Sequence, residues 1–219
     1  MLRRLASAQR QVERMIRPLV LASLILASGP AGAADGRGYV EGEAGMFLPI
    51  ESSATGAYLG QDATITYTPG VVLAAAGGYQ FKNGVRGEGE LDFRRVTTDR
   101  MSTPAGRISA DGDLRSYGFM ANLYYDVITR TAVTPYVGGG VGLAVADFGR
   151  GSSKGAPLWN PGHDLSVAYQ GIGGFLVRLT ERTSLDLASH HYAIPRVHLD
   201  TLSADFRGIN LCAGIRHWF

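Results

Sequence analysis

Three features that commonly define a protein class are scarce or missing in this sequence. Cys212 is the only cysteine, so an internal disulfide is excluded. The apolar run at residues 18–28 is well short of the roughly 20 residues that a membrane-spanning helix needs. Beyond that run, no window repeats apolar residues at the 3.6-residue period of an amphipathic helix. A disulfide framework, a helical membrane anchor and a helical fold are therefore all disfavoured.

The first 33 residues have the features of a secretory signal peptide. Arginines precede the apolar run, and Ala31-Gly32-Ala33 supplies the small residues that a signal peptidase needs. We therefore predict a cleaved signal peptide at 1–33, with cleavage after Ala33 or Ala34, and a mature domain at 34–219. Met15 is an alternative start for the leader.

The mature domain lacks an excess of positive charge. The whole chain has 21 Lys and Arg against 19 Asp and Glu. The leader holds five arginines and one acid, Glu13, which leaves 16 basic and 18 acidic residues in the mature domain. Because nucleic-acid binding needs a basic face or stripe, we expect no nucleic-acid partner.

Apolar and polar residues alternate with period two along much of the mature domain. The clearest segment is VRGEGELDFRR at 85–95, where charged residues occupy every second position. Successive side chains of a strand point to opposite faces, so this strand has one ionic and one apolar face. The same reasoning predicts eight strands, at 39–48, 71–81, 85–95, 116–127, 134–146, 165–179, 183–192 and 206–219.

Short and long connections alternate between the predicted strands. The short connections are 82–84, which carries the Asn-Gly hairpin signal, 128–132 and 180–182. The long connections are rich in Ser, Thr, Gly, Asp and Pro and lie at 51–70, 97–113, 147–164 and 193–205. Outer-membrane barrels have short periplasmic turns, longer outer loops and an even number of strands. Because every backbone polar group in hydrocarbon must be paired internally, we predict an all-β fold, a closed eight-stranded antiparallel up-and-down transmembrane β-barrel.

Five sequence blocks resemble one family of bacterial surface proteins. They are GYQFKNGVRGEGELDFRR, NLYYDV, TPYVGGGVGLA, AYQGIGGF and GIRHWF. In this order they resemble the opacity-protein and outer-membrane-protein-A-like porin family, the small eight-stranded barrels of Gram-negative bacteria. The resemblance covers residues 36–219 and implies that the barrel-assembly machinery recognises Ile215, His217 and Phe219 on the last strand. The family usually has an aromatic residue where His217 stands.

The charged strand faces should point into the barrel lumen, which at eight strands is only wide enough for side chains. The first and last strands must pair, which places Arg216 at about the depth of Glu41, with Asp186 nearby on the seventh strand. We predict an ion-pair band formed by Glu41, Arg86, Glu88, Asp186 and Arg216. Glu43, Glu90, Asp92 and Arg94 complete the predicted set of lumen charges. The alternative is that these residues lie on solvated faces of a soluble sandwich.

Two motifs suggest chemistry only superficially. Ser189-His190-His191 contains a nucleophile and a base, but adjacent strand residues point to opposite faces, so Ser189 and His190 do not pair easily. The glycine-rich segment 138–142 lacks the lysine and the following helix of a phosphate-binding loop. We therefore expect no catalytic residue and no cofactor.

Loop composition leaves the function broad. His163, Asp164, His198 and Asp200 lie in or beside predicted loops, and their spacing does not require a metal ion, so we expect none. We expect a monomeric structural protein of the cell outer membrane, whose outer loops act in adhesion or as an antigen. Its expected partners are outer-membrane lipids, the barrel-assembly machinery and a host or surface ligand. A narrow porin for small solutes and a lipid-modifying enzyme are the alternatives.

Overall fold

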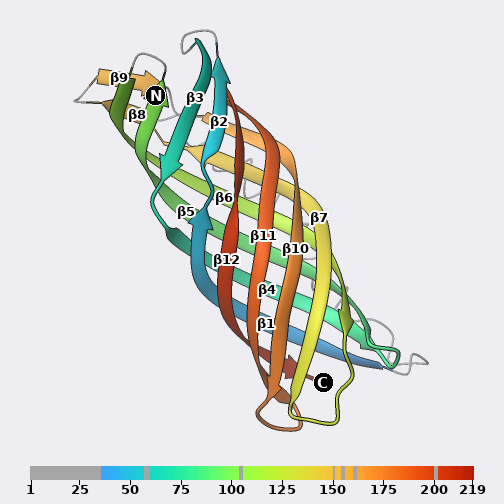
Figure 1. Cartoon of the computed structure of the whole chain (residues 1–219). Coiled ribbons are helices and arrows are strands. Elements are labelled where there is room, and N and C mark those ends of the chain that lie inside the picture. Colours follow the sequence, from blue (N-terminus) through green and yellow to red (C-terminus); the bar gives the residue numbers. More distant parts are fainter. Residues whose placement is uncertain are drawn as a thin grey trace, which may run out of the picture.

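The computed structural model describes residues 36–56, 60–103, 106–149, 151–153, 156–159, 162–199 and 202–219. In these ranges every regular element is a β-strand, and the long strands run side by side around a tilted cylinder (Figure 1). Within the same ranges, no helix has the length and apolar character to cross a membrane. The predicted signal peptide lies outside the described residues.

Eight long strands form the wall of the cylinder. They are β1 (Gly36–Pro49), β4 (Gly70–Phe81), β5 (Val85–Thr103), β6 (Gly106–Asp126), β7 (Val133–Phe148), β10 (Gly162–Arg178), β11 (Thr183–Leu199) and β12 (Leu202–Trp218). Each pairs antiparallel with the next of these strands, and β1 pairs with β12. The prediction of a closed eight-stranded antiparallel barrel is therefore confirmed. Closure pairs the edges that hydrocarbon would otherwise leave without hydrogen bonds.

The closing seam between β1 and β12 is continuous. The register runs from Tyr39 opposite Trp218 to Pro49 opposite Gly208, and it places Glu41 directly opposite Arg216. Beyond the last strand, the backbone N–H of Phe219 donates to the carbonyl of Gly38 at 3.0 Å. The C-terminal segment is thus held by backbone pairing along the whole seam.

The β4–β5 connection is the tight turn that the Asn-Gly pair predicts. Gly84 has a φ of 85°, a left-handed conformation that glycine adopts without steric cost. Its N–H donates to the Phe81 carbonyl at 3.2 Å, and the Asn83 side chain accepts from the Val85 N–H at 3.1 Å. These bonds fix the register of the strands on either side of the turn.

At the opposite end, the strands extend much farther than the sequence pattern predicts. The predicted loop 97–113 is largely strand, because β5 and β6 keep pairing until Thr103 lies opposite Gly106. Two further hairpins stand at the end away from the C-terminus, β2 (Ser52–Gly56) with β3 (Gly60–Tyr67) and β8 (Gly151–Ser153) with β9 (Ala156–Trp159) (Figure 1). These parts of the predicted long loops are therefore paired strands. Antiparallel backbone pairing requires no apolar alternation, so it continues through Ser, Thr and Gly.

The outward faces of the strands form an apolar belt. Leu123, Val141 and Val167 are 63%, 64% and 59% exposed, and β1, β4, β10, β11 and β12 also carry exposed large apolar side chains. On β5, the outward residues Leu91 and Phe93 are half-buried. A continuous apolar surface of this extent is unusual on a soluble monomer. It is the surface that a barrel presents to lipid.

The lumen holds two buried clusters with apolar or aromatic members. The outer apolar cluster lies towards the extended strand ends and includes Phe47, Val96, Leu114, Phe148, Ile194 and Phe206. The inner cluster includes the aromatic residues Tyr39, Tyr124, Tyr136 and Trp218, with Leu176. The sequence pattern predicted the lumen charges but not this outer cluster, which closes the outer part of the lumen with apolar side chains.

Candidate functional site

Arg86 is the centre of the first ion-pair group near the inner end of the lumen. Its side chain is fully buried, and its guanidinium lies 3.2 Å from Glu88 and 3.3 Å from Asp126. It also donates to the Tyr39 hydroxyl at 3.0 Å and stacks over the Tyr124 ring at 3.8 Å. Charge, hydrogen bonds and π contacts together compensate the loss of water around this cation.

Arg216 is the centre of a second group across the closing seam. One of its nitrogens lies 2.5 Å from Glu41 on β1 and 2.7 Å from Asp186 on β11. The Tyr136 hydroxyl donates to Asp186 at 2.6 Å. The Arg216 guanidinium also lies 4.6 Å from the centre of the Tyr39 ring. Charges from three neighbouring strands therefore meet at one buried arginine.

Arg94 forms a third group, farther towards the outer end. It pairs with Asp92 on its own strand and donates to the Asn210 side chain at 3.3 Å. Its guanidinium lies 3.6 Å from the centre of the Tyr192 ring, whose side chain belongs to the outer apolar cluster. Arg94 thus lies at the boundary between the ionic and the apolar parts of the lumen.

Side-chain amides surround Glu90, which lies on the same strand as Arg94. The carboxylate accepts from Asn122 at 2.6 Å and from Gln170 at 2.8 Å. Gln170 also donates to Asn122 at 3.0 Å and contacts His190 at 3.4 Å. The imidazole of His190 lies 3.6 Å from Glu43.

The structure divides the residues of the predicted ion-pair band between two groups. Arg86 contacts Glu88, and Arg216 contacts Glu41 and Asp186. Two further partners, Asp126 and Tyr39, were not among the residues predicted from the sequence. Asp126 continues the alternation of Asn122 and Tyr124 within the predicted strand 116–127, and this alternation is the signal that could have identified it. Tyr39 links the two groups, because its hydroxyl contacts the Arg86 group and its ring faces Arg216.

The charge in the middle of the lumen is unbalanced. Below the outer apolar cluster, the described lumen holds seven mostly buried carboxyl groups, Glu41, Glu43, Glu88, Glu90, Asp92, Asp126 and Asp186. Three buried arginines, Arg86, Arg94 and Arg216, oppose them. Hydrogen bonds from amides and hydroxyls compensate part of this excess of acid.

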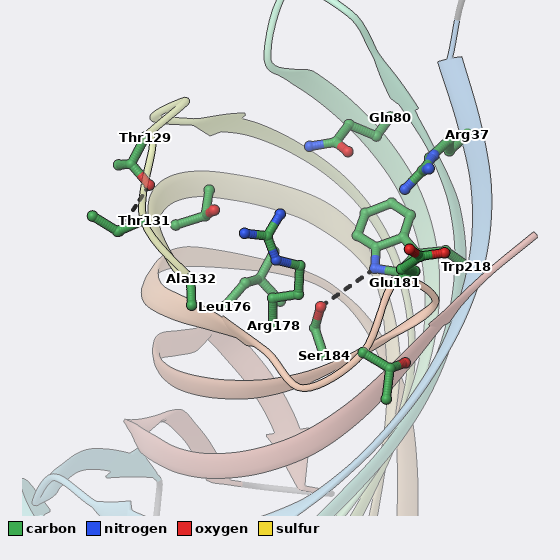
Figure 2. A pocket seen from close by; sticks show the side chains of 12 residues that line it. Arg37, Gln80, Thr129, Thr131, Ala132, Leu176, Arg178, Glu181, Ser184 and Trp218 are labelled. Atoms are coloured by element: carbon green, nitrogen blue, oxygen red, sulfur yellow. Dashed lines mark hydrogen bonds between the residues drawn. The ribbon is translucent and has the colours of Figure 1, made fainter.

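The inner mouth of the barrel contains a small polar pocket of about 160 Å³. Arg37, Arg178 and Glu181 lie around it, and Trp218 donates from its indole N–H to Ser184 at 3.5 Å (Figure 2). Trp218 belongs to the buried inner cluster. The buried inner cluster therefore forms part of the wall of this pocket.

The remaining candidate residues are separated by the strand alternation. Ser189 and His191 are exposed on the outward face of β11, whereas His190 is buried in the lumen. His163 is exposed and Asp164 half-buried at the start of β10. Asp200 and the side chain of His198 lie outside the described residues.

The three residues of the proposed assembly signal lie on the outward face of β12 and just beyond it. Ile215 and Phe219 are 50% and 69% exposed. His217 is the residue midway between them, and its ring packs against the Phe219 ring with 6.0 Å between the ring centroids. They form an outward stripe beside the inner mouth.

Beyond the outer margin of the apolar belt, Asp113 binds two exposed arginines. Its carboxylate oxygens lie 3.1 Å from Arg95 and 3.0 Å from Arg115. Partial burial acts to raise the pKa of Asp113, but the hydrogen bonds from both arginines outweigh burial and lower that pKa below its ordinary value.

A closed small barrel with an apolar belt outside and buried ion pairs inside defines a class, the transmembrane β-barrels. The family model described as outer membrane protein beta-barrel domain matches residues 19–216. The chain therefore belongs to the outer membrane β-barrel family, which implies a place in the outer membrane of Gram-negative bacteria. No curated protein matches the sequence.

Solved structures share the fold at low sequence identity. OprG, an outer membrane protein from Pseudomonas aeruginosa, is 16% identical with a TM-score of 0.62, and the match covers 86% of this chain and 98% of OprG. Neisserial surface protein A is 21% identical with a TM-score of 0.53, and the match covers 83% of this chain and 97% of that protein. At these identities the likeness concerns the fold.

Proposed function

We propose that the protein is a monomeric structural component of the outer membrane that catalyses no reaction and carries adhesive or antigenic hairpins at its outer end. The filled lumen is the observation that carries this proposal. Arg86, Arg94 and Arg216 cross it at no more than 1% exposure, and the outer apolar cluster closes it above them. A lumen packed in this way supports a scaffold more than a conduit.

The extended outer hairpins are the part of the scaffold suited to recognition. The β5–β6 ladder continues beyond the apolar belt, and β2–β3 and β8–β9 stand beside it. Binding residues are often carried by segments that a rigid framework holds away from its core. We infer a host or surface ligand for these hairpins.

The remaining partners follow from the proposed route to the membrane. The chain would be exported through a cleaved signal peptide, and the barrel-assembly machinery would recognise the outward stripe of Ile215, His217 and Phe219. Outer-membrane lipids would then surround the apolar belt.

Adherence of bacteria that display the protein tests the proposed role. Thr98 lies opposite Gly112 in the β5–β6 ladder, so an Asn-Gly turn can replace residues 99–111 without changing the register below it. Cells displaying the parent should adhere to cultured epithelial cells, and the shortened variant should adhere less while still folding. Gly42→Ala, a lipid-facing change, is the matched control. Adherence of the parent no greater than that of empty-vector cells would contradict the adhesive role.

Two measurements separate the proposal from its rivals. In planar bilayers, the protein should give no steady single-channel openings, whereas regular openings would favour a narrow porin. Lipid A mass spectra should be the same for cells with and without the protein. A new lipid A species that disappears in His190→Ala would favour a lipid-modifying enzyme.

A further inference from the structure

Glu43, His190 and Cys212 form a compact group of metal-type ligands inside the lumen. One donor atom from each, a carboxylate oxygen, an imidazole nitrogen and the sulfur, lies within 4.8 Å of the other two. They come from β1, β11 and β12, and β12 is the strand between the other two. The group therefore spans the seam that closes the barrel.

A hollow at Gly214 lets Glu43 reach the other two residues. Gly214 lies directly opposite Glu43 in the β1–β12 register. A Cβ atom at Gly214 would lie only 2.7 Å from the Cγ of Glu43. The Glu43 side chain therefore occupies space that the side chain of any larger residue at position 214 would fill. It lies across β12 towards Cys212 and His190.

A chain of hydrogen bonds orients the His190 ring. The amide nitrogen of Gln170 donates to Glu90 at 2.8 Å and to Asn122 at 3.0 Å, so the amide oxygen is the atom left to face His190. That oxygen lies 3.4 Å from Nδ1 of His190, which assigns the ring proton to Nδ1. The lone pair on Nε2 then points towards Glu43. A carboxamide oxygen that holds Nδ1–H is the usual kind of support behind a metal-binding histidine.

The Nε2 atom of His190 is buried and lacks a hydrogen-bond partner among the described residues. The His190 side chain is only 4% exposed, and Nε2 lies 3.6 Å from a carboxylate oxygen of Glu43. Two electron-pair donors and a sulfur thus face one another in an enclosed space with an excess of acidic groups. A cation placed among them would satisfy all three.

We propose that Glu43, His190 and Cys212 bind a divalent transition-metal ion of the Zn²⁺ class. A mixed set of sulfur, nitrogen and oxygen donors suits such ions, whereas Mg²⁺ and Ca²⁺ require oxygen ligands. Tetrahedral bonds of about 2.0–2.3 Å hold donor atoms roughly 3.3–3.8 Å apart, so the three side chains need to close by only about 1 Å. A water molecule would complete the coordination.

A second acidic group in the lumen lacks these properties. Glu41, Glu43 and Asp186 also lie close together, but Arg216 binds Glu41 and Asp186 and supplies their positive charge. The site with sulfur and imidazole ligands instead holds the unpartnered imidazole nitrogen of His190. An ion there would connect β1, β11 and β12, and binding to the folded state alone would stabilise the barrel.

Cobalt binding tests the proposal directly, because Co²⁺ reports a thiolate ligand by a charge-transfer absorption. The full chain is refolded in detergent with Co²⁺ present, and excess metal is removed. We expect one Co²⁺ per chain, a thiolate-to-cobalt band, and displacement of Co²⁺ by Zn²⁺. Cys212→Ser should remove the band, and His190→Ala should weaken binding by more than 10-fold.

Controls separate loss of the site from loss of the fold. His191→Ala changes the neighbouring histidine on the outward face and should leave affinity and absorption unchanged. Glu43→Gln and Cys212→Ser are close in size to the native residues, and heat-modifiable migration on a gel verifies that each variant folds. Absence of the band in the folded parent, or equal affinity of parent and folded His190→Ala, would overturn the proposal.

Discussion

The inner and outer parts of the lumen fill the same narrow cylinder with opposite chemistry. In the inner part, Arg86 and Arg216 are held by carboxylates and aromatic rings from several strands. In the outer part, Phe47 and Phe206 pack with ring centres 5.1 Å apart inside an apolar cluster. Ion pairs demand particular partners, so the inner part specifies which strands meet. Apolar packing is less specific, and it closes the lumen against water.

Removing Arg216 should produce the largest loss of stability. Arg216→Ala leaves Glu41 and Asp186 buried without their cation, which costs roughly 3–5 kcal/mol of unfolding free energy. Guanidinium unfolding, followed by the shift between folded and unfolded gel bands, measures the loss. Arg207→Ala is the control, because Arg207 is 47% exposed in its pair with Asp205 and its loss should cost under about 1 kcal/mol. Similar midpoints for Arg216→Ala and the parent would contradict the proposed importance of the ion pairs.

Truncating Phe206 tests the outer part. Phe206→Ala opens a cavity beside Phe47 and should lower the unfolding free energy by about 3 kcal/mol, with the barrel still closed. Arg216 lies in the inner part of the lumen and Phe206 in the outer part, and the contacts described for them share no residue. The stability losses of Arg216→Ala and Phe206→Ala should therefore add within about 0.5 kcal/mol. Strong coupling in this double-mutant cycle would show that the two parts do not act separately.

A methyl group at Gly214 should disturb the seam. In Gly214→Ala the new Cβ would lie 2.7 Å from Cγ of Glu43 and 2.9 Å from the Gly42 carbonyl, which should cost about 1–3 kcal/mol. Gly42→Ala is the matched control on the opposite face, where no atom lies within 4 Å of the new Cβ. Denaturant midpoints compare the two variants. Equal midpoints would contradict close packing on the lumen side of the seam.

The smallest effect is expected at the outer rim, from Asp113→Asn. The native pKa of Asp113 is below its unfolded value, so its ion pairs stabilise the barrel above the unfolded pKa and lose that contribution as pH falls through the native pKa. The difference between parent and variant should be about 0.2–1 kcal/mol at neutral pH and should vanish in strong acid. Unfolding curves at both pH values measure it. A difference that grows in acid would have the wrong sign.

The sequence predicted the wall of the barrel better than its ends. In 85–95 the alternation of charged and apolar residues determines which side chains can face lipid, so both the strand and its inward face could be predicted. Glu41 and Arg216 could be placed at one depth because a closed sheet must join its first and last strands. The extension of β5 and β6 could not be predicted, because backbone pairing in water leaves no apolar pattern. The contacts of Tyr39 also required the structure, because its ring alone does not specify which strands supply its partners.

Heat-modifiable migration of the protein from an isolated outer-membrane fraction tests the central claim most directly. A closed barrel with a packed lumen stays folded in dodecyl sulfate until it is heated. The unheated protein should therefore run as a compact species, and the boiled protein should shift to the position of the unfolded chain. A single band at the unfolded position before and after heating, or recovery of the protein outside the outer-membrane fraction, would contradict the account.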